Sequence, residues 1–465
     1  MANTLYKNRV PITLLQKYDR PGPRYTSYPT VPEWTESVGP HQYKAALQKA
    51  SQTPAEPLSV YVHLPFCEKR CYFCACNVVI PTRKRNSDDY LEILYREIEN
   101  TAALLGARNK IVQLHFGGGT PTFLSVSQFA TLLDKLECAF VFSADAEISI
   151  EVDPRVTTDE QLKYLRSRGF NRVSMGVQDF NPVVQKAINR IQPYEQTKHC
   201  VDYSRELGYA GVNIDLIYGL PHQNVAGFTE TIDKALTLRP DRVALYSFAY
   251  LPESMKHQNF IKPIDLPELE VKAALFSTAH GMFSEAGYQH IGMDHFALPG
   301  DELSLAQNNG KLQRNFMGYT TKVSPDLIGL GVSGIGYVSD TFVQNHAKLE
   351  SYQEKIQNGG FATHRGLKLA KDDLIRQFVI SSIMCNFKLD FQKLQEKFSV
   401  SFHDYFSAEF DQLGPFAADG IIILSDDSLC VTALGRTFVR NVSMIFDAYL
   451  RSKPAADRPA FSRTI

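Results

Sequence analysis

The chain has 465 residues, of which 44% are hydrophobic and 21% are charged. This composition is typical of globular proteins and excludes a disordered chain. The 49 Lys and Arg side chains nearly balance the 50 Asp and Glu side chains, which gives a formal net charge of -1. That balance excludes a chain-wide basic surface, so we expect no nucleic-acid partner. At ~100–200 residues per domain, the length predicts two or three domains, or one large catalytic domain with extensions.

No stretch approaches the about 20 apolar residues of a membrane span. The first residues also lack a basic region followed by an apolar core, which a signal peptide would have. We therefore expect a cytoplasmic protein without membrane association, whose eight cysteines stay reduced. Four of them lie within ten residues: Cys67, Cys71, Cys74 and Cys76. The scattered four are expected to be small buried side chains: Cys138, Cys200, Cys385 and Cys430.

Residues 1–57 show no clear strand and only weak helical patterns, so they are predicted to form an N-terminal arm. Its segment 21–30, PGPRYTSYPT, is rich in Pro, Gly and Tyr, which is typical of irregular structure. Two interpretations are equally open. The arm is either a surface tail or a cover over a ligand cleft, to which Tyr25 and Tyr28 beside Arg24 are suited.

From residue 58 onward, predicted strands alternate with predicted helices. Strands are expected at residues 58–63, 111–116, 146–152, 171–177, 211–219 and 242–248. Helices are expected at 87–106, 126–138, 158–168, 182–190, 194–207, 226–238 and 266–286. This alternation predicts an α/β fold with a parallel sheet and right-handed crossovers. Six consecutive units favour a partial (β/α)6 TIM-like barrel, in which the chemistry lies at the C-terminal ends of the strands.

The pattern changes after about residue 365. Helices are predicted at 371–388, 390–398 and 403–413, and a β-hairpin signal around residues 425–428 precedes another helix. We therefore predict three parts: the arm (1–57), a catalytic part-barrel (58–365) and a small, mostly helical C-terminal domain (366–465). The lack of a coiled-coil pattern predicts a monomer.

The four clustered cysteines have the spacing C-x3-C-x2-C-x-C directly after the first predicted strand. Such spacing arises by accident on the order of once in ten thousand chains of this cysteine content. Structural zinc sites usually pair two separated cysteine knuckles or recruit His, whereas these cysteines share one loop. The spacing therefore favours an iron–sulfur cluster. If only Cys67, Cys71 and Cys74 bind, one iron stays open for a substrate or cofactor, while Cys76 as a fourth ligand would close the cluster.

Other motifs follow the later strands. The glycines of residues 117–121, GGGTP, allow backbone N–H groups to approach a ligand and to form a small anion nest. Glu151 and Asp153 end the third strand, and Asp215 lies within an apolar strand, where a carboxylate is costly unless it is paired. The glycine-rich residues 329–337 lack the context of a nucleotide-binding loop and are interpreted as a close-packed wall.

A resemblance to the oxygen-independent coproporphyrinogen III dehydrogenases, in the radical S-adenosylmethionine superfamily, runs from about residue 12 to the C-terminus. Eight segments carry it: PRYTSYPT, YVHLPFCEKRCYFCACN, LHFGGGTPT, ISIEVDPR, FNRVSMGVQDFN, NIDLIYGLP, YQHIGMDHFA and RNFMGYTT. The resemblance implies that Cys67, Cys71 and Cys74 bind a 4Fe–4S cluster whose fourth iron is chelated by S-adenosylmethionine. Under this reading Cys76 is not a ligand, and its role is open.

The resemblance also implies two S-adenosylmethionine molecules. One would contact Tyr61, Gly118, Glu151 and Ile335. The second would contact Phe73, Gly119, Thr120, Gln178, Arg190, Asp215 and Ala249. The implied substrate, coproporphyrinogen III, carries four propionates, for which Arg24, Arg190 and Arg314 are candidate partners because guanidinium groups bind carboxylates bidentately. A surface role is equally open for Arg24 and Arg314. Further possible substrate or accessory residues are Cys76, Tyr25 and Phe316.

The implied activity is an oxidoreductase reaction of haem biosynthesis. A 5′-deoxyadenosyl radical would start the oxidative decarboxylation of two propionates, giving protoporphyrinogen IX. The electron donor, such as a flavodoxin or ferredoxin, is not named by the sequence. Two alternatives stay open: a radical enzyme that methylates or opens haem, and a haem chaperone. The chaperones usually have Phe at the position of Cys76 and lack the arm. Many family members have Gln where Met317 stands, so Met317 is left out of the site.

Overall fold

A computed structural model of the protein describes residues 10–81, 85–453 and 461–464. All six predicted strands are present, and they pair in parallel in chain order. They are β1 (Leu58–Leu64), β2 (Lys110–Gly118), β3 (Val141–Val152), β4 (Arg172–Gln178), β5 (Gly211–Tyr218) and β6 (Arg242–Ser247). The predicted α/β part-barrel is confirmed. None of the helices in the described part of the chain is long and apolar enough to cross a membrane.

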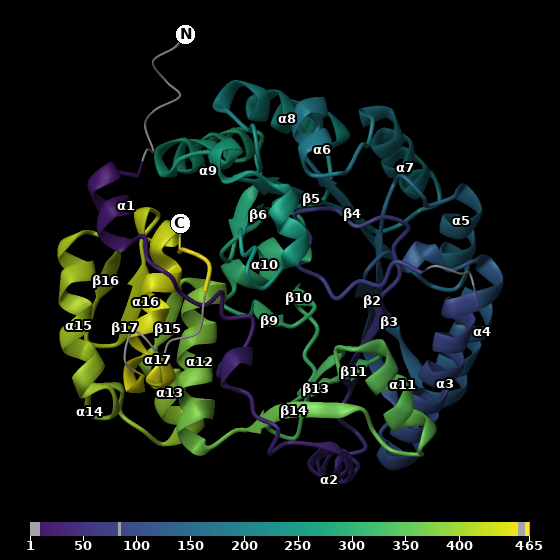
Figure 1. Cartoon of the computed structure of the whole chain (residues 1–465). Coiled ribbons are helices and arrows are strands. Elements are labelled where there is room, and N and C mark those ends of the chain that lie inside the picture. Colours follow the sequence, from purple (N-terminus) through teal and green to yellow (C-terminus); the bar gives the residue numbers. More distant parts are fainter. Residues whose placement is uncertain (1–9, 82–84, 454–460, 465) are drawn as a thin grey trace.

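Helices connect these strands and form an outer layer around the curved sheet (Figure 1). They are α3 (Arg85–Leu105), α4 (Val126–Ala139), α5 (Asp159–Ser167), α6 (Pro182–Ala187), α7 (Tyr194–Glu206), α8 (Val225–Leu238) and α9 (Leu269–Glu285). Local sequence explains where they begin. The Ser125 hydroxyl caps α4 by accepting from the Gln128 N–H at 3.3 Å, and Thr158 caps α5 in the same way. Each helix then buries one apolar face against the strands.

The sheet extends beyond the six predicted strands to twelve, in the order β14-β13-β12-β11-β1-β2-β3-β4-β5-β6-β8-β7. At one edge, β11 (Asp326–Leu330) lies parallel to β1 and is followed by antiparallel β12 (Ile335–Val338), β13 (Thr341–Asn345) and β14 (Thr363–Lys368). At the other edge lie β7 (Gln289–Ile291) and β8 (His295–Ala297). Strand β14 crosses the boundary predicted at residue 365. The glycine-rich residues 329–337 are close-packed as expected, since a Cβ on Gly329 would lie 2.2 Å from the Ile335 carbonyl oxygen.

The arm contains more regular structure than the sequence indicated. It holds α1 (Ile12–Tyr18), the 3-10 helix η1 (Val31–Glu33) and α2 (Pro40–Ala50). Helix α2 was not predicted, and it buries four side chains against the sheet: Tyr43, Ala46, Leu47 and Ala50. Residues 21–30 run between the barrel and the C-terminal helices, where the buried Arg440 guanidinium donates to the Pro23 carbonyl at 3.0 Å and to that of Gly22.

The C-terminal part is mostly helical, as predicted, and lies at the open side of the barrel (Figure 1). Its helices are α12 (Lys371–Asn386), α13 (Phe391–Phe398), α14 (Phe402–Tyr405), α15 (Ser407–Ala418), α16 (Val439–Ile445) and α17 (Ala448–Ser452). The predicted hairpin is present as β16 (Ile422–Leu424) and β17 (Ser428–Val431), which β15 (Lys388–Asp390) extends. This part shares a hydrophobic core with Tyr18, Tyr25 and Tyr28 of the arm. Between sheet and C-terminal part lie α10 (Glu302–Asn308), β9 (Gln313–Asn315) and β10 (Gly318–Thr320), whereas α11 (Leu349–Gln357) packs against α3.

The scattered cysteines agree only partly with the prediction. Cys200 and Cys385 are buried, as expected. Cys430 is partly exposed, and Cys138 is exposed near the end of α4, so the prediction of a buried side chain was wrong for Cys138. Near a helix end the sequence pattern does not show which face of the helix a residue occupies. The last turn contains residues on every face, buried and exposed.

Arg108, between α3 and β2, connects α2, the segment before β1 and the start of β11. Its side chain is 1% exposed and lies 2.5 Å from the Asp326 carboxylate at the start of β11. The guanidinium also donates to the carbonyl oxygens of Ala50 at 3.1 Å and Glu56 at 3.2 Å. A single buried cation thus fixes the end of α2, the segment before β1 and the first residue of β11.

Replacing Arg108 with Met should destabilise the fold strongly. The change leaves the Asp326 carboxylate buried without its cation, which costs roughly 3–5 kcal/mol. Denaturant unfolding followed by circular dichroism measures this loss. The double variant with Asp326→Asn should recover part of the stability, because the amide oxygen still accepts from the Ser339 N–H. Arg168→Met serves as the surface control, with an expected loss of about 1 kcal/mol or less. Equal losses at Arg108 and Arg168 would contradict the role given to Arg108.

Candidate active site

The clustered cysteines lie on a loop that follows β1, here named the cysteine loop (residues 65–79). Cys71 is buried, Cys67 and Cys74 are partly exposed, and Cys76 is exposed. Neighbouring segments hold the loop in place. The Tyr72 N–H donates to the Ile188 carbonyl at 3.0 Å, and a His257 ring nitrogen lies 2.6 Å from the Cys74 carbonyl oxygen. The thiols are therefore presented by a loop that is fixed from two sides.

The glycine segment of β2 contacts this loop through its backbone. The N–H of Gly119 donates to the Leu64 carbonyl and that of Thr120 to the Phe66 carbonyl, both at 2.8 Å. A Cβ on Gly119 would lie 2.7 Å from the Pro65 carbonyl oxygen, so only glycine fits. The Gly118 N–H donates to Glu151 at 3.2 Å. These N–H groups are used inside the protein, so the predicted anion nest was wrong. The glycines instead bring the cysteine loop to backbone contact with β2.

Two arginines lie against the buried Cys71 thiol. The Arg155 and Arg190 guanidinium nitrogens are 3.7 and 3.8 Å from its sulfur, and both pair with Asp153, at 2.6 and 3.1 Å. Burial works to raise the pKa of the Asp153 carboxyl, but Arg190 and Arg155 lower it below its ordinary value. The two cations thus place positive charge directly against the Cys71 sulfur. Arg155 was missed as a site residue, although it stands in the quoted segment ISIEVDPR.

The other thiols differ in their acidity. Burial raises the pKa of Cys67 to about 12, so metal binding there must displace a proton. A hydrogen bond from Cys76 lowers the pKa of Cys74 to about 7, while the same contact raises the pKa of Cys76 well above its ordinary value. The Cys76 N–H also donates to the Cys74 sulfur at 3.4 Å. Cys76 therefore acts toward Cys74 as a hydrogen-bond donor.

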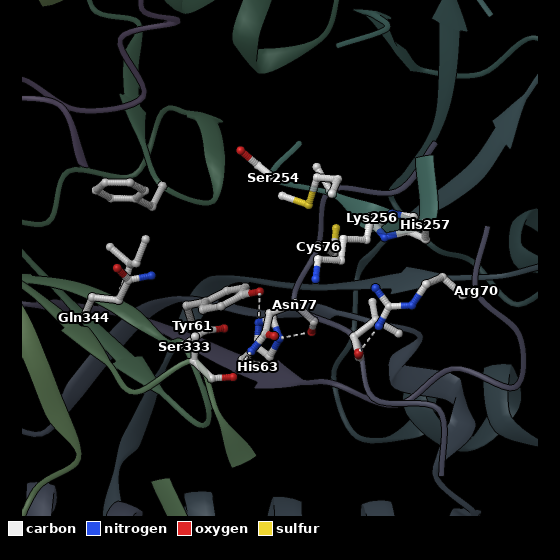
Figure 2. Close-up of a pocket in the computed structure, with 16 residues that line it drawn as sticks. Tyr61, His63, Arg70, Cys76, Asn77, Ser254, Lys256, His257, Ser333 and Gln344 are labelled. Carbon is white, nitrogen blue, oxygen red and sulfur yellow. Dashed lines mark hydrogen bonds between the residues drawn. The ribbon is translucent and has the colours of Figure 1, made fainter. Parts of the chain in front are cut away.

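The residues predicted for the first S-adenosylmethionine lie together. The Tyr61 hydroxyl is 3.0 Å from a ring nitrogen of His63, and Glu151 accepts from the Gly118 N–H. Tyr61 and Ile335 line a cavity of about 710 Å³, which also contains the exposed Cys76. Figure 2 shows Tyr61, His63 and Asn77 on one side of this cavity and Cys76 beside Lys256 and His257 on the other. Its volume lies in the range of small-molecule sites, about 300–1,000 Å³. His63 was not predicted.

The residues predicted for the second molecule lie in smaller groups. Gln178 and Arg190 meet beside Gly176, and the Gln178 side-chain oxygen and the Arg190 Nε are buried without a hydrogen-bond partner among the described residues. Gln178 also has a positive φ of 69°. Such orphaned polar atoms cost about 1–3 kcal/mol each, so they fit a site that a polar ligand completes. Phe73 and Ala249 are joined through the Gln258 amide, which donates to both carbonyls, and Thr120 lies 3.3 Å from the Cys67 sulfur.

Asp215 lies in the polar interior of the barrel. Its carboxylate accepts from Asn213 at 2.8 Å and from Ser174 at 3.3 Å, so the expected pairing is present. Asp215 and Glu151 line the same cavity of about 130 Å³. Burial and the Glu151 carboxylate raise the pKa of Asp215 to about 6. Asp215 is thus grouped with Glu151, a residue predicted for the first molecule. Met317 lines this cavity as well.

The arm lies across the C-terminal end of β6. The Arg24 guanidinium donates to the Ser247 carbonyl at 2.8 Å and lies 3.9 Å from Asp294. The interpretation of the arm as a surface tail is therefore wrong. Arg314 is also turned inward, with its guanidinium 4.9 Å from the centre of the Tyr319 ring. Tyr25 is anchored differently, since its buried hydroxyl donates to Asp447 of the C-terminal part at 2.9 Å.

Phe316 packs against two rings, 5.6 Å from Trp34 and 5.9 Å from Phe342. It lines the larger cavity opposite the cysteine loop. In the described part of the chain, no three His, Cys, Asp or Glu side chains are arranged around one metal ion.

Comparison with known proteins agrees with this geometry. The model of the radical SAM superfamily matches residues 61–235, and that of the HemN C-terminal domain matches residues 369–438. The oxygen-independent coproporphyrinogen III oxidase of Escherichia coli is 45% identical over 454 residues, which cover 98% of each chain. The chain belongs to this family. The Pseudomonas aeruginosa member is 44% identical, over 97% of this chain and 98% of its own.

The family also has a matching solved structure, that of the Escherichia coli coproporphyrinogen III oxidase (HemN), described as a radical SAM enzyme. The two chains superpose with a TM-score of 0.90 at 43% identity, covering 94% of this chain and 99% of the other. The predicted resemblance is thereby confirmed. Membership of the radical SAM superfamily implies a 4Fe–4S cluster and S-adenosylmethionine. The three thiols and the orphaned polar atoms described above fit both groups.

The carboxyl of Asp215 should titrate with a midpoint near pH 6, protonated below and ionised above it. Infrared difference spectra of wild type against Asp215→Asn between pH 4 and 8 isolate this carboxyl band. Glu151→Gln should lower the midpoint, because it removes the nearby negative charge that opposes ionisation. The exposed Glu350→Gln should leave it unchanged. A midpoint near pH 4 in the wild type would contradict the environment given to Asp215.

Proposed function

We propose that this enzyme converts coproporphyrinogen III into protoporphyrinogen IX in haem biosynthesis, without oxygen. The observation that carries the proposal is the loop of Cys67, Cys71 and Cys74 at a cavity of about 710 Å³, in a chain that matches the oxygen-independent coproporphyrinogen III oxidases over 98% of its length. In each of two rounds a propionate would lose one hydrogen atom, one electron and carbon dioxide, and a vinyl group would remain.

When bound, the cluster and S-adenosylmethionine supply a 5′-deoxyadenosyl radical. Cys67, Cys71 and Cys74 hold the cluster, and Arg155 and Arg190 keep positive charge against the Cys71 sulfur. The barrel (58–365) positions cofactor and substrate, and the arm (1–57) excludes water from its opening. The C-terminal domain (366–465) anchors the arm. A radical centre needs this exclusion because water and oxygen offer side reactions.

We assign two S-adenosylmethionine molecules to the site. The group around Tyr61, Gly118, Glu151 and Ile335 would bind the first. The second would lie against Gln178 and Arg190, whose orphaned atoms need a polar partner. Its other proposed contacts are Phe73, Gly119, Thr120, Asp215 and Ala249. Two cofactor molecules match a substrate on which two propionates react.

The propionates need cations, and Arg24 and Arg314 are the proposed ones, with Phe316 against the macrocycle. We further propose that the enzyme acts as a monomer in the cytoplasm, where thiols stay reduced. Its electrons would come from a small one-electron donor protein such as a flavodoxin or ferredoxin.

The reaction itself is the first test. After anaerobic reconstitution with iron and sulfide, incubation with S-adenosylmethionine, reductant and coproporphyrinogen III should yield 5′-deoxyadenosine and protoporphyrinogen IX. Cys67→Ser should lose the visible absorbance of the cluster and all activity, because serine is a poor cluster ligand. Cys76→Ser should keep the absorbance, because Cys76 is not a proposed ligand.

Parallel incubations with haem separate the alternatives. Modified haem would indicate a haem methylase or a ring-opening enzyme, and bound, unmodified haem with no turnover of either substrate would indicate a chaperone. If incubation with coproporphyrinogen III yields 5′-deoxyadenosine but no protoporphyrinogen IX, the proposed reaction is contradicted.

The number of bound cofactors is a second test. Equilibrium dialysis of reconstituted wild type should give two S-adenosylmethionine molecules per chain. Gln178→Asn should give one, because asparagine tolerates the positive φ but is too short to place its amide where Gln178 does. The control Gln196→Asn, at an exposed position of α7, should retain two. A value of one in wild type, or of two in Gln178→Asn, would contradict the second site.

A further inference from the structure

A second cavity, of about 610 Å³, shares one lining residue, Phe316, with the cavity beside the cysteine loop in the described part of the chain. It is lined by residues 25–28 of the arm, by the β9–β10 hairpin and by α12, which lies next to β9 (Figure 1). None of its lining residues belongs to the cysteine loop. We call this cavity the α12 crevice.

The walls of the α12 crevice combine aromatic rings with cations. The Lys397 ammonium lies 5.2 Å from the centre of the Phe378 ring and 5.5 Å from that of Phe398. It pairs with no carboxylate among the described residues, and neither does the exposed Lys311 at the rim. The Nε of Arg314 is buried in the wall and has no hydrogen-bond partner among the described residues.

Negative charge in the wall is scarce. Asp340 is the one acidic side chain that lines the crevice among the described residues, and it lies 3.8 Å from the Lys49 ammonium outside the crevice. The remaining lining cation, Lys322, is neutralised by Asp145 at 3.2 Å. Lys311 and Lys397 are therefore left without a carboxylate partner beside aromatic rings, in a wall that also carries hydroxyl and amide groups. Such a wall suits a flat apolar molecule that carries carboxylates.

We propose that the α12 crevice is a second binding site for a tetrapyrrole carboxylate, a holding site outside the reacting cavity. The macrocycle would lie against Phe378 and Phe398, and its carboxylates would pair with Lys311 and Lys397. The volume lies within the ~300–1,000 Å³ of small-molecule sites. The ligand class rests on the proposed function, since substrate and product of that reaction are tetrapyrrole carboxylates. Phe316 separates the held molecule from the cavity beside the cysteine loop.

Protoporphyrin IX is the probe. Its fluorescence is titrated anaerobically against the reconstituted enzyme with S-adenosylmethionine bound, and wild type should bind two molecules per chain. Lys311→Glu/Lys397→Glu should weaken one of the two sites about tenfold or more, because each pairing becomes a repulsion. Ser381→Trp, which fills the crevice from an exposed position of α12, should remove that site altogether. The matched control is Lys163→Glu, an exposed lysine of α5 outside the crevice.

Two further measurements decide the assignment. Octaethylporphyrin, which has the macrocycle but no carboxylates, should not distinguish wild type from Lys311→Glu/Lys397→Glu. Turnover of saturating coproporphyrinogen III should be unchanged in the crevice variants. One bound protoporphyrin in wild type, or two in Ser381→Trp, overturns the proposal, as does loss of turnover together with loss of binding, which would place the crevice in the reacting site. If wild type binds two but makes no protoporphyrinogen IX, the proposed function alone fails.

Discussion

The backbone contact between the cysteine loop and the glycine segment of β2 is the constraint on which the site depends. Hydrogen bonds from Gly119 and Thr120 to the carbonyls of Leu64 and Phe66 continue the pairing of β1 with β2 past the end of the strands. Any side chain at Gly119 would push the loop away, since its Cβ would lie 2.7 Å from backbone atoms that cannot move independently. This contact places Cys67, the first of the three cysteines proposed to bind the cluster, beside Thr120.

Charge acts locally in this protein. A net charge of -1 for the whole chain does not describe the charges at the site. There, Asp153 lies between Arg155 and Arg190. Both guanidinium groups also lie against the Cys71 sulfur. In a low-dielectric interior such pairs interact far more strongly than the exposed charges that dominate the sum. The carboxylate also keeps the arginines oriented, because one nitrogen of each guanidinium contacts both the Asp153 carboxylate and the Cys71 sulfur. The positive charge against the Cys71 sulfur therefore depends on three side chains, from the end of β3 and the loop after α6.

The sequence predicted the parts whose signal is local. Strands β1 to β6 are apolar runs between clear breaks, and the cysteine spacing stands within one loop. Strands β7 to β14 are three to six residues long and gain their stability from partners far away in the chain, such as β1 for β11, so their own pattern is weak. The glycines of β2 were correctly singled out, but residue type does not tell where an N–H points. The N–H groups of Gly118, Gly119 and Thr120 donate to the Glu151 carboxylate and to two backbone carbonyls of the protein itself. Arg155 and His63 were missed because their importance comes from what they touch.

The arm illustrates how burial decides between two interpretations of the same residues. A part-barrel leaves one side of its sheet open, and ordering a chain segment across that opening costs about 1–2 kcal/mol per residue in backbone entropy. Here that cost is offset by Tyr18, Tyr25 and Tyr28, which enter the core of the C-terminal part, and by Arg440, which binds two arm carbonyls from within it. The arm is thus held from the C-terminal side while Arg24 reaches the barrel at Ser247. The arm segment that lies across the C-terminal end of β6 is therefore stabilised by a core that belongs to the C-terminal part and not to the barrel.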